Sequence, residues 1–324
     1  MNKTFSRWAA IACLGTLPLA AAAQGAVSLY GLIDVSVGQT EAPGGAADKG
    51  VDSGKLTTSY FGFKGDEDLG GGLKAAFAIE SFLRADTGEA GRFNGDPFWA
   101  RSAWVGLAGG WGSLNLGRNT TSLFVQTLIF NAFGDSFGFS PSIRHHFTSG
   151  TVTGDTGWSD SVKYASPKFG GLGFTLHGAA ADGGGGRNAG ASALYFGGPL
   201  AAGLTWQKVE KGAAVDDTTA WQLAASYDFK LAKVYGQYSQ VDNDTTGNAF
   251  DILGLGATVP AGPGKVMAQW GRIDPDSGAE RKTLSLGYGI DLSKRTDLYG
   301  AYMNDKLSGT GTGNSYSLGM RHRF

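Results

Sequence analysis

Few residues of this chain have the types and spacing that catalysis or metal binding requires. A serine hydrolase needs a serine, a histidine and a carboxylate close together, whereas this chain has only four histidines. The segment Asp242–Asp251 resembles the start of a calcium loop, but its twelfth position is Leu253 and not the glutamate that binds calcium bidentately. The adjacent pair His145 and His146 is typical of a loop and not of a metal site. We therefore expect no enzyme activity, no metal site and no cofactor.

The composition narrows the class of protein. Charged residues make up 17% of the chain, below the average of about 25%, while glycine reaches 54 residues and aromatic residues 12%. The 27 basic and 28 acidic residues nearly balance, so the chain lacks the basic footprint of a nucleic-acid partner. After residue 24 no apolar run approaches the roughly 20 residues of a membrane helix. A glycine-rich all-β chain remains, either in solution or in an outer membrane.

The first residues have the pattern of a secretory signal peptide. Lys3 and Arg7 precede an apolar core, and three alanines at 21–23 form an A-x-A cleavage site before Gln24. This predicts a signal peptide at 1–23 and one mature domain at 24–324. A lipobox ending at Cys13 and a buried first helix are the alternatives. Because Cys13 is the only cysteine, the mature chain would contain no thiol for disulfides or thiolate metal sites.

Alternation of apolar and polar residues predicts strands along the whole mature chain. In 219–229, for example, Trp221 and Leu223 share one parity while Gln222 and Ser226 share the other, as expected when successive side chains face opposite sides. The sixteen predicted strands are 26–38, 55–65, 73–84, 98–108, 113–119, 158–167, 172–181, 191–197, 201–210, 219–229, 232–241, 249–259, 264–273, 282–291, 296–306 and 315–324.

The connections between these strands alternate in length. Those after even-numbered strands are short and glycine-rich, such as AGGWG and PAGPG, whereas those after odd-numbered strands are longer and polar, such as TEAPGGAADKGVDSG. Transmembrane barrels have this asymmetry, with short periplasmic turns and long outer loops. Strands in hydrocarbon must also close, because an open edge leaves amides unsatisfied. The sequence therefore predicts an all-β fold, a 16-stranded antiparallel transmembrane β-barrel.

One long loop, at about 119–157, differs from the others. It contains the apolar stretch SLFVQTLIFNAF, followed by GDSFGFS, and is too apolar to hang in water. Folding it into the barrel would bury Phe124, Leu128, Ile129 and Phe133 and narrow the lumen. The spacing of its apolar residues predicts a short helix at 121–131. Long loops in compact proteins are usually functional, so we expect a functional role for this one.

Four segments and the C-terminus have distinctive motifs: VSLYGLID (27–34), SYFGFKGDEDLGGGLKAAFAIE (59–80), ARSAWVGLAGGWGSLNLGR (100–118), DSVKYASPKFGGLGF (160–174) and the terminal GMRHRF (319–324). Together they resemble general outer-membrane porins of the beta-proteobacterial and neisserial type. The resemblance spans the mature chain. It implies a homotrimer in the outer membrane, surrounded by lipid and lipopolysaccharide, through which ions and small hydrophilic solutes diffuse passively. No nucleic-acid partner is implied.

The resemblance also implies the residues of the pore. In such porins the long loop after the fifth strand forms the constriction, and an acidic group on it faces basic groups on the wall, which makes Asp135 the acidic candidate and Phe324 the assembly signal. The candidate residues of the constriction are Asp135, Arg101, Arg118, Arg144, Lys74, Lys64, Tyr60 and Glu80. Tyr60 departs from the family motif, which usually reads S-R-x-G. A second arginine expected before S-V-x-Y is also absent, and both changes argue against strong anion selectivity.

Several of these assignments have alternatives. Asp135 fits an ordinary solvated loop carboxylate, and Arg101 and Arg118 fit caps at the barrel rim as well as lumen positions. For the whole chain the alternatives are an outer-membrane barrel enzyme, a soluble adhesin or structural β protein, and a substrate-specific channel. The pattern of loop lengths and the terminal phenylalanine favour the general porin.

Overall fold

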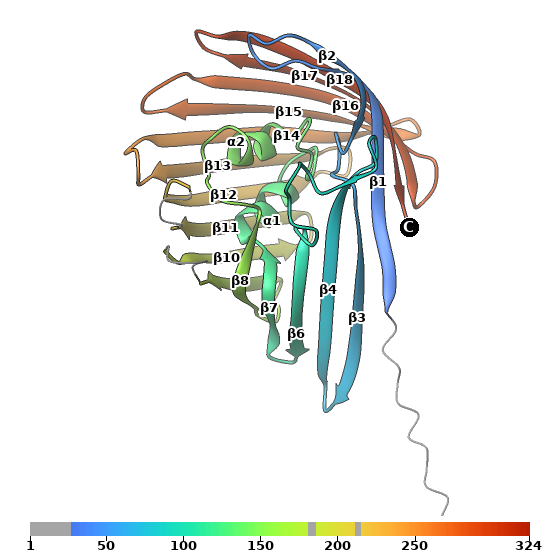
Figure 1. Ribbon diagram of the computed structural model, residues 1–324, viewed down its shortest axis with the longest axis vertical. Coiled ribbons are helices and arrows are strands. Elements are labelled where there is room, and N and C mark those ends of the chain that lie inside the picture. The colour runs from blue at the N-terminus through green and yellow to red at the C-terminus, as the bar shows by residue number, and fades with distance from the viewer. Residues whose placement is uncertain (1–26, 181–185, 211–214) are drawn as a thin grey trace, which may run out of the picture.

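In the computed structural model, which describes residues 27–180, 186–210 and 215–324, the chain forms a closed antiparallel barrel (Figure 1). Sixteen strands form the wall, each pairing with its neighbour in the sequence, and β1 closes the ring against β18. Two further short strands, β2 (Asp48–Ser53) and β5 (Glu89–Ala90), lie in the first two outer loops. The wall strands are β1 (Ser28–Thr40), β3 (Tyr60–Gly70), β4 (Leu73–Arg84), β6 (Ser102–Gly109), β7 (Gly112–Thr120), β8 (Gly157–Ala165), β9 (Leu172–Ala179), β10 (Asn188–Gly197), β11 (Leu200–Val209), β12 (Thr218–Asp228), β13 (Lys233–Asn243), β14 (Ala249–Ala261), β15 (Gly264–Pro275), β16 (Arg281–Asp291), β17 (Thr296–Leu307) and β18 (Gly311–Arg323).

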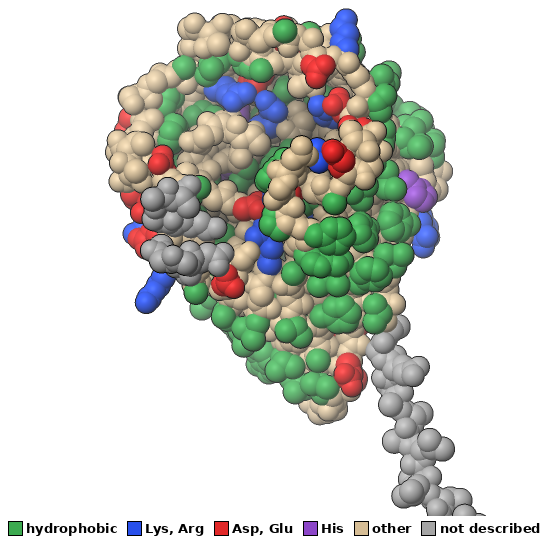
Figure 2. Space-filling model, in the orientation of Figure 1, with side chains coloured by type: hydrophobic (Ala, Val, Ile, Leu, Met, Phe, Trp, Pro, Cys, Tyr) green, Lys and Arg blue, Asp and Glu red, His purple; other side chains and the backbone are tan. Residues whose placement is uncertain are grey.

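The predicted alternation is confirmed, because apolar side chains cover the outside of the barrel and polar ones line the inside. On β12, Leu223 is 55% exposed while the neighbouring Gln222 is fully buried in the interior. Leu204 and Trp206 of β11 lie directly opposite Leu223 and Trp221 of β12 and share their outward parity. Figure 2 shows a broad hydrophobic band over β1, β3, β4 and β6, with the charged side chains gathered mainly beyond it. Such a band is what a wall embedded in hydrocarbon requires.

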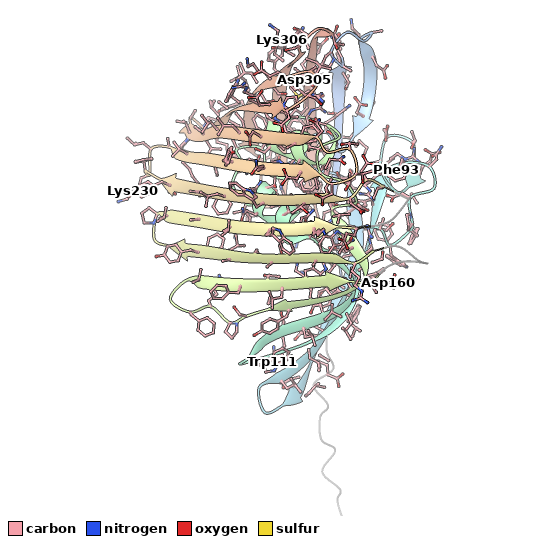
Figure 3. The ribbon with its side chains drawn as sticks, turned by 90° about the vertical axis from the view of Figure 1, so that its left-hand side faces the viewer. Phe93, Trp111, Asp160, Lys230, Asp305 and Lys306 are labelled. Atoms are coloured by element: carbon pink, nitrogen blue, oxygen red, sulfur yellow. The ribbon has the colours of Figure 1, made fainter. Side chains whose placement is uncertain are left out.

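The loops also follow the predicted asymmetry. One end of the barrel has tight turns, such as residues 71–72 and 262–263, and the other has the loops 41–59, 85–101 and 121–156. Phe93 in a long loop and Lys230 in a short turn lie at opposite ends of the barrel (Figure 3). The turn after β3 uses Gly71 and Gly72 at φ of +60° and +80°, a conformation that suits glycine. Among the described residues, no helix is long and apolar enough to cross a membrane.

Most strand predictions agree with the structure within a few residues, but the second one is shifted. The wall strand was expected at 55–65 and instead begins at Tyr60. Asp34 of β1 accepts hydrogen bonds from the amides of Leu56 and Thr57 at 2.8 and 2.7 Å, so the chain turns inward there. Part of the expected first loop forms β2, which pairs with the outer half of β1. The expected strand ends at residues 26 and 181 lie outside the described residues.

The apolar core lies inside the barrel, between the long third loop and the wall. One cluster joins Leu56, Phe133 and Phe139 to Met267 and Met303. A second cluster is formed by Leu123, Val152, Val241, Ile252 and Ile273. The core therefore fixes the loop 121–156 against β13 to β17, as expected of a constriction loop.

Candidate functional site

The constriction loop, residues 121–156, contains two short helices with polar caps. Helix α1 (Ser122–Ile129) begins at Thr121, whose hydroxyl accepts a hydrogen bond from the Phe124 amide at 3.3 Å. Helix α2 (Pro141–Phe147) begins at Ser140, which caps the Ile143 amide at 3.2 Å and is followed by proline at the first helical position. The helix predicted at 121–131 is therefore confirmed, and α2 was not predicted.

Polar side chains of the constriction loop also bind the wall, beside the apolar core. On α1, Gln126 donates to the Gln222 carbonyl at 2.8 Å and accepts from the Thr205 hydroxyl at 2.8 Å. On α2, His145 bonds the Thr283 hydroxyl and His146 bonds the Ser239 hydroxyl, both at 2.8 Å.

The two α2 histidines are fully enclosed. Burial lowers the pKa of His145 to about 3, with the nearby Arg281 acting in the same direction, and lowers that of His146 to about 4. Both imidazoles are therefore neutral hydrogen-bonding groups at physiological pH.

Some apolar side chains of the constriction loop are not covered by the wall. Phe124 stacks on Phe137 at 5.9 Å and meets Phe147 edge-on at 5.4 Å. These three rings, with Leu128, are only partly buried. The expected burial is found for Phe133, which enters the core, and in part for Ile129, which packs against the buried cluster of Phe130, Ala201 and Ala224. For Phe124 and Leu128 the expectation is wrong, because both side chains stay only partly buried.

The tip of the constriction loop is fastened to the inward-turned segment 54–59. Ser136 donates its hydroxyl to the Lys55 carbonyl at 2.7 Å, and the Gly138 amide donates to the same oxygen at 3.1 Å. Asp135 accepts from the Thr57 hydroxyl at 3.1 Å, and Thr57 in turn accepts from Arg321 at 2.9 Å. Burial raises the pKa of Asp135, while the charges of Arg101 and Arg321 act in the other direction. Asp135 thus lies within electrostatic range of basic wall residues.

Four of the predicted wall residues meet in one cluster. Arg101 bonds Glu80 at 2.5 Å, and its guanidinium lies 3.8 Å from the centre of the Tyr60 ring. Tyr30 donates to Glu80 at 2.6 Å, and Lys64 lies over the Tyr30 ring at 4.5 Å. The cluster therefore places two cations on two aromatic faces around a single carboxylate.

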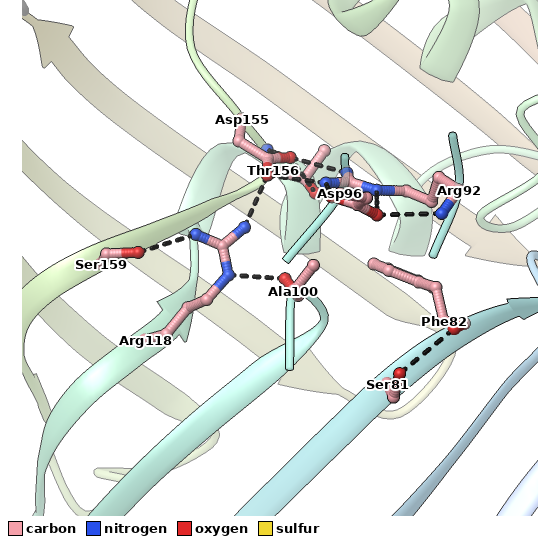
Figure 4. Close-up of polar contacts among 9 residues, drawn as sticks. All are labelled: Ser81, Phe82, Arg92, Asp96, Ala100, Arg118, Asp155, Thr156 and Ser159. Carbon is pink, nitrogen blue, oxygen red and sulfur yellow. Dashed lines mark hydrogen bonds and ion pairs between the residues drawn. The ribbon is translucent and has the colours of Figure 1, made fainter. Parts of the chain in front are cut away.

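Arg118 lies in a different network, at the base of the constriction loop. It contacts Asp155 at 2.5 Å and donates to the Ala100 carbonyl and the Ser159 hydroxyl, while Arg92 bridges Asp155 and Asp96 (Figure 4). Burial disfavours the charge of Asp155, but the hydrogen bonds of Arg92 and the charge of Arg118 outweigh it and lower the pKa to about 2. This network ties the second outer loop to the constriction loop.

Arg144 and Lys74 also lie away from Asp135 and Arg101. Arg144 on α2 pairs with Asp305 of β17 at 3.2 Å, where Arg281 also binds. Lys74 is exposed near the β3–β4 turn and lies 3.5 Å from Asp66. The structure thus groups Tyr60, Glu80, Arg101 and Lys64 on one wall.

Comparison with known sequences gives the family of this chain. Residues 9–310 match the family described as Gram-negative porin. The chain belongs to this family. It is 32% identical to outer membrane porin protein 32 of Delftia acidovorans over 96% of this chain and 92% of that protein. It is 28% identical to an outer membrane porin protein of Bordetella pertussis over the full length of both.

A solved structure agrees with the sequence comparison. The anion-selective porin from Comamonas acidovorans superposes with a TM-score of 0.79 and 28% identity, covering 93% of this chain and all of that one. This chain is an outer-membrane porin, a water-filled barrel for passive diffusion of ions and small hydrophilic solutes.

Three further residues of the porin, which sequence reasoning missed, contact the predicted ones. Tyr30, Thr57 and Arg321 complete the contacts of Glu80 and Asp135. Arg321 could have been predicted, because in the terminal GMRHRF it has the polar, inward-facing parity of β18. Thr57 had no signal, because its position depends on the inward turn held by Asp34.

The terminal residue of the porin helps to close the barrel. The Phe324 amide donates to the Gly31 carbonyl at 3.2 Å, and the Gly31 amide donates back at 3.3 Å. The Phe324 ring covers Gly31, where an added Cβ would lie 2.6 Å from it. Glycine at position 31 therefore makes room for the terminal ring.

Proposed function

We propose that this porin is only weakly selective for charge, because the arginines at its eyelet are paired with carboxylates. Arg101 is paired with Glu80, and Arg321 and Arg323 bond the two oxygens of Asp297 at 2.9 and 2.7 Å. The Comamonas protein is described as anion-selective, whereas this chain carries Tyr60 where the family motif usually has an arginine. The eyelet is bounded by Asp135 on the loop and by the Arg101 cluster on the wall.

The decisive measurement is the zero-current potential of the reconstituted channel across a KCl gradient. Paired charges give little net field in the water-filled neck, so the potential should lie near zero at pH 7. A potential close to the limit for chloride alone or potassium alone would overturn weak selectivity. It would leave the channel function intact, since stepwise conductance tests that function separately.

The second part of the proposal concerns assembly. Three copies associate in the outer membrane, and the remaining apolar band contacts lipid and lipopolysaccharide. Support comes from the exposed aliphatic side chains of the wall, such as Leu204, Leu255 and Leu318. Unboiled protein should migrate as a trimer in detergent gels, and conductance should rise in sets of three. Single, independent steps from protein that migrates as a monomer would contradict the trimer.

The third part concerns the leader and the absence of catalysis. Residues 1–23 are removed on export, so the mature mass should correspond to a chain that begins at Gln24. The porin hydrolyses neither phospholipid nor peptide. This is supported by the positions of His145 and His146, which the constriction loop buries against the wall. Hydrolysis by the folded protein that heat unfolding abolishes would contradict this part.

A further inference from the structure

A recess of about 390 Å³ lies in the inner wall near the Arg101 cluster, on the side toward the β3–β4 turn. Its lining includes Tyr30, Lys64, Glu80, Ser102 and Trp104. Pockets that bind small ligands usually have at least about 300 Å³, mostly apolar walls and a few polar groups. The recess therefore has the size and the character of a ligand site.

The strand register explains how the recess forms. One row across β1, β3, β4 and β6 consists of Tyr30, Gly62, Glu80 and Ser102, and the next consists of Ser28, Lys64, Ala78 and Trp104. The middle of these rows holds the small residues Gly62 and Ala78. The outer strands carry the two rings and are three strand spacings of about 4.8 Å apart, so the hollow between the rings is wide enough for a six-membered ring.

The charges of the recess are unequal. Glu80 is neutralised, because it accepts from Tyr30 at 2.6 Å and from Arg101 at 2.5 Å. The recess has a second carboxylate, Asp66, which pairs with Lys74 at 3.5 Å. Lys64 is exposed and lies over Tyr30, and within the described residues no carboxylate lies within ion-pair distance of its ammonium. One available cation beside two aromatic rings is suited to an anion that carries an aromatic ring.

The opposite side of the lumen is consistent with such a solute. The constriction loop presents the partly exposed rings of Phe124 and Phe137 to the lumen. Asp135, two residues from Phe137, lies in the field of Arg101. A solute that crosses the eyelet thus passes between apolar and cationic surfaces before it reaches the recess.

We propose that this recess binds single-ring aromatic carboxylates, with the ring between Tyr30 and Trp104 above Ala78 and the carboxylate on Lys64. The proposal rests on the channel function and assigns that channel a preferred class of solute. Retention at the recess raises the local concentration of these solutes in the lumen and slows the passage of other ions while the site is occupied.

The test uses the full trimeric channel in a planar bilayer at pH 7, with benzoate as the probe. Benzoate added on both sides should reduce the KCl current in a saturable manner, whereas acetate, which lacks the ring, and benzamide, which lacks the charge, should not at equal concentration. Lys64→Gln and Trp104→Ala should each raise the half-blocking benzoate concentration about tenfold. Ala78→Leu, which fills the hollow, should abolish the block.

Lys265→Gln is the matched control, because Lys265 is a lysine on the inner side of β15, outside the recess. Its half-blocking concentration should equal that of the wild type. Equal shifts in Lys64→Gln and Lys265→Gln, an unchanged Trp104→Ala, or equal block by acetate and benzoate would overturn the proposal. Normal KCl conductance without benzoate block would refute the site alone, whereas absent conductance would refute the channel itself.

Discussion

The inner wall of the barrel has two halves that share one sequence pattern and differ in their surroundings. On β11 to β17 the inward polar side chains are covered by the constriction loop, and residues such as Gln222 and Ser239 bind it. On β1, β3, β4 and β6 they face the lumen, where Lys64 is exposed and Arg101 is partly exposed. Alternation thus decides which way a side chain points, but the loop decides whether it supports structure or meets solute.

The largest effect should come from Asp305, whose loss should destabilise the half of the barrel that the constriction loop covers, β11 to β17. It is fully buried on β17, between Arg144 and Arg281, and also accepts from Thr283 at 2.9 Å. Asp305→Asn leaves two enclosed guanidinium groups without their anion, which should cost about 3–5 kcal/mol of unfolding free energy. The loss is read as a lower temperature for the conversion of folded to heat-modified protein.

Lys306→Ala is the control for this change. Lys306 follows Asp305 on β17 and is exposed (Figure 3), so its loss should change stability by no more than about 0.5 kcal/mol. Equal destabilisation by the two substitutions would contradict the distinction between inward and outward side chains on this strand.

The second largest effect should come from acid pH, which should weaken the attachment of the constriction loop to β11–β17. The pKa values of His145 and His146 are lowered to about 3 and about 4, so below pH 6.5 the detached loop binds protons that the attached loop cannot. Attachment is complete above pH 6.5 and should lose about 1.4 kcal/mol per histidine for each pH unit below it, until the lowered pKa values are reached. Noise and closures of the channel should therefore increase from pH 6 to pH 4.

Replacing both histidines by glutamine removes these protonation sites while keeping hydrogen-bonding groups. This double variant should show a flatter dependence of channel noise on pH than the wild type. Asp135, whose pKa is raised, also gains a proton in acid. The Asp135→Asn variant measures separately how much Asp135 contributes to the pH dependence of the channel noise. An unchanged pH profile in the histidine variant would assign the acid response to Asp135 or to another group.

The sequence predicted the inward side chains of the uncovered half (β1, β3, β4 and β6) better than those of the covered half (β11 to β17), although the start of β3 was shifted. Period-two alternation and loop lengths depend on neighbouring residues, so the strands and the inward placement of Glu80 and Lys64 could be read directly. Arg144 and Arg118 could not be placed, because their partners Asp305 and Asp155 are brought near only when the loop folds inward. For the same reason the sequence did not show that Phe124 and Leu128 stay partly exposed while Leu123 and Phe130 of the same segment are buried.

A substitution at Glu80 changes the charge of the uncovered half, β1, β3, β4 and β6, without disturbing the constriction loop. Glu80→Gln should keep a hydrogen bond to Tyr30 but leave Arg101 without its carboxylate. A unit charge at about 8 Å in water changes an ion's energy by about 0.5 kcal/mol, or about twofold in permeability. The zero-current potential across a KCl gradient should therefore shift toward chloride by that factor. A shift toward potassium would contradict the pairing of Arg101 with Glu80.

Tyr60 gives the smallest expected effect and the most direct test of the departure from the family motif. Tyr60→Arg adds a cation beside Arg101, in place of the ring that now lies 3.8 Å from it. The new side chain is solvated and screened by salt, so the shift toward chloride should be less than twofold and should diminish as KCl is raised. Tyr60→Phe keeps the ring and adds no charge, so its zero-current potential should match the wild type. An equal shift in both variants would show that the ring, and not the missing arginine, governs selectivity at this wall.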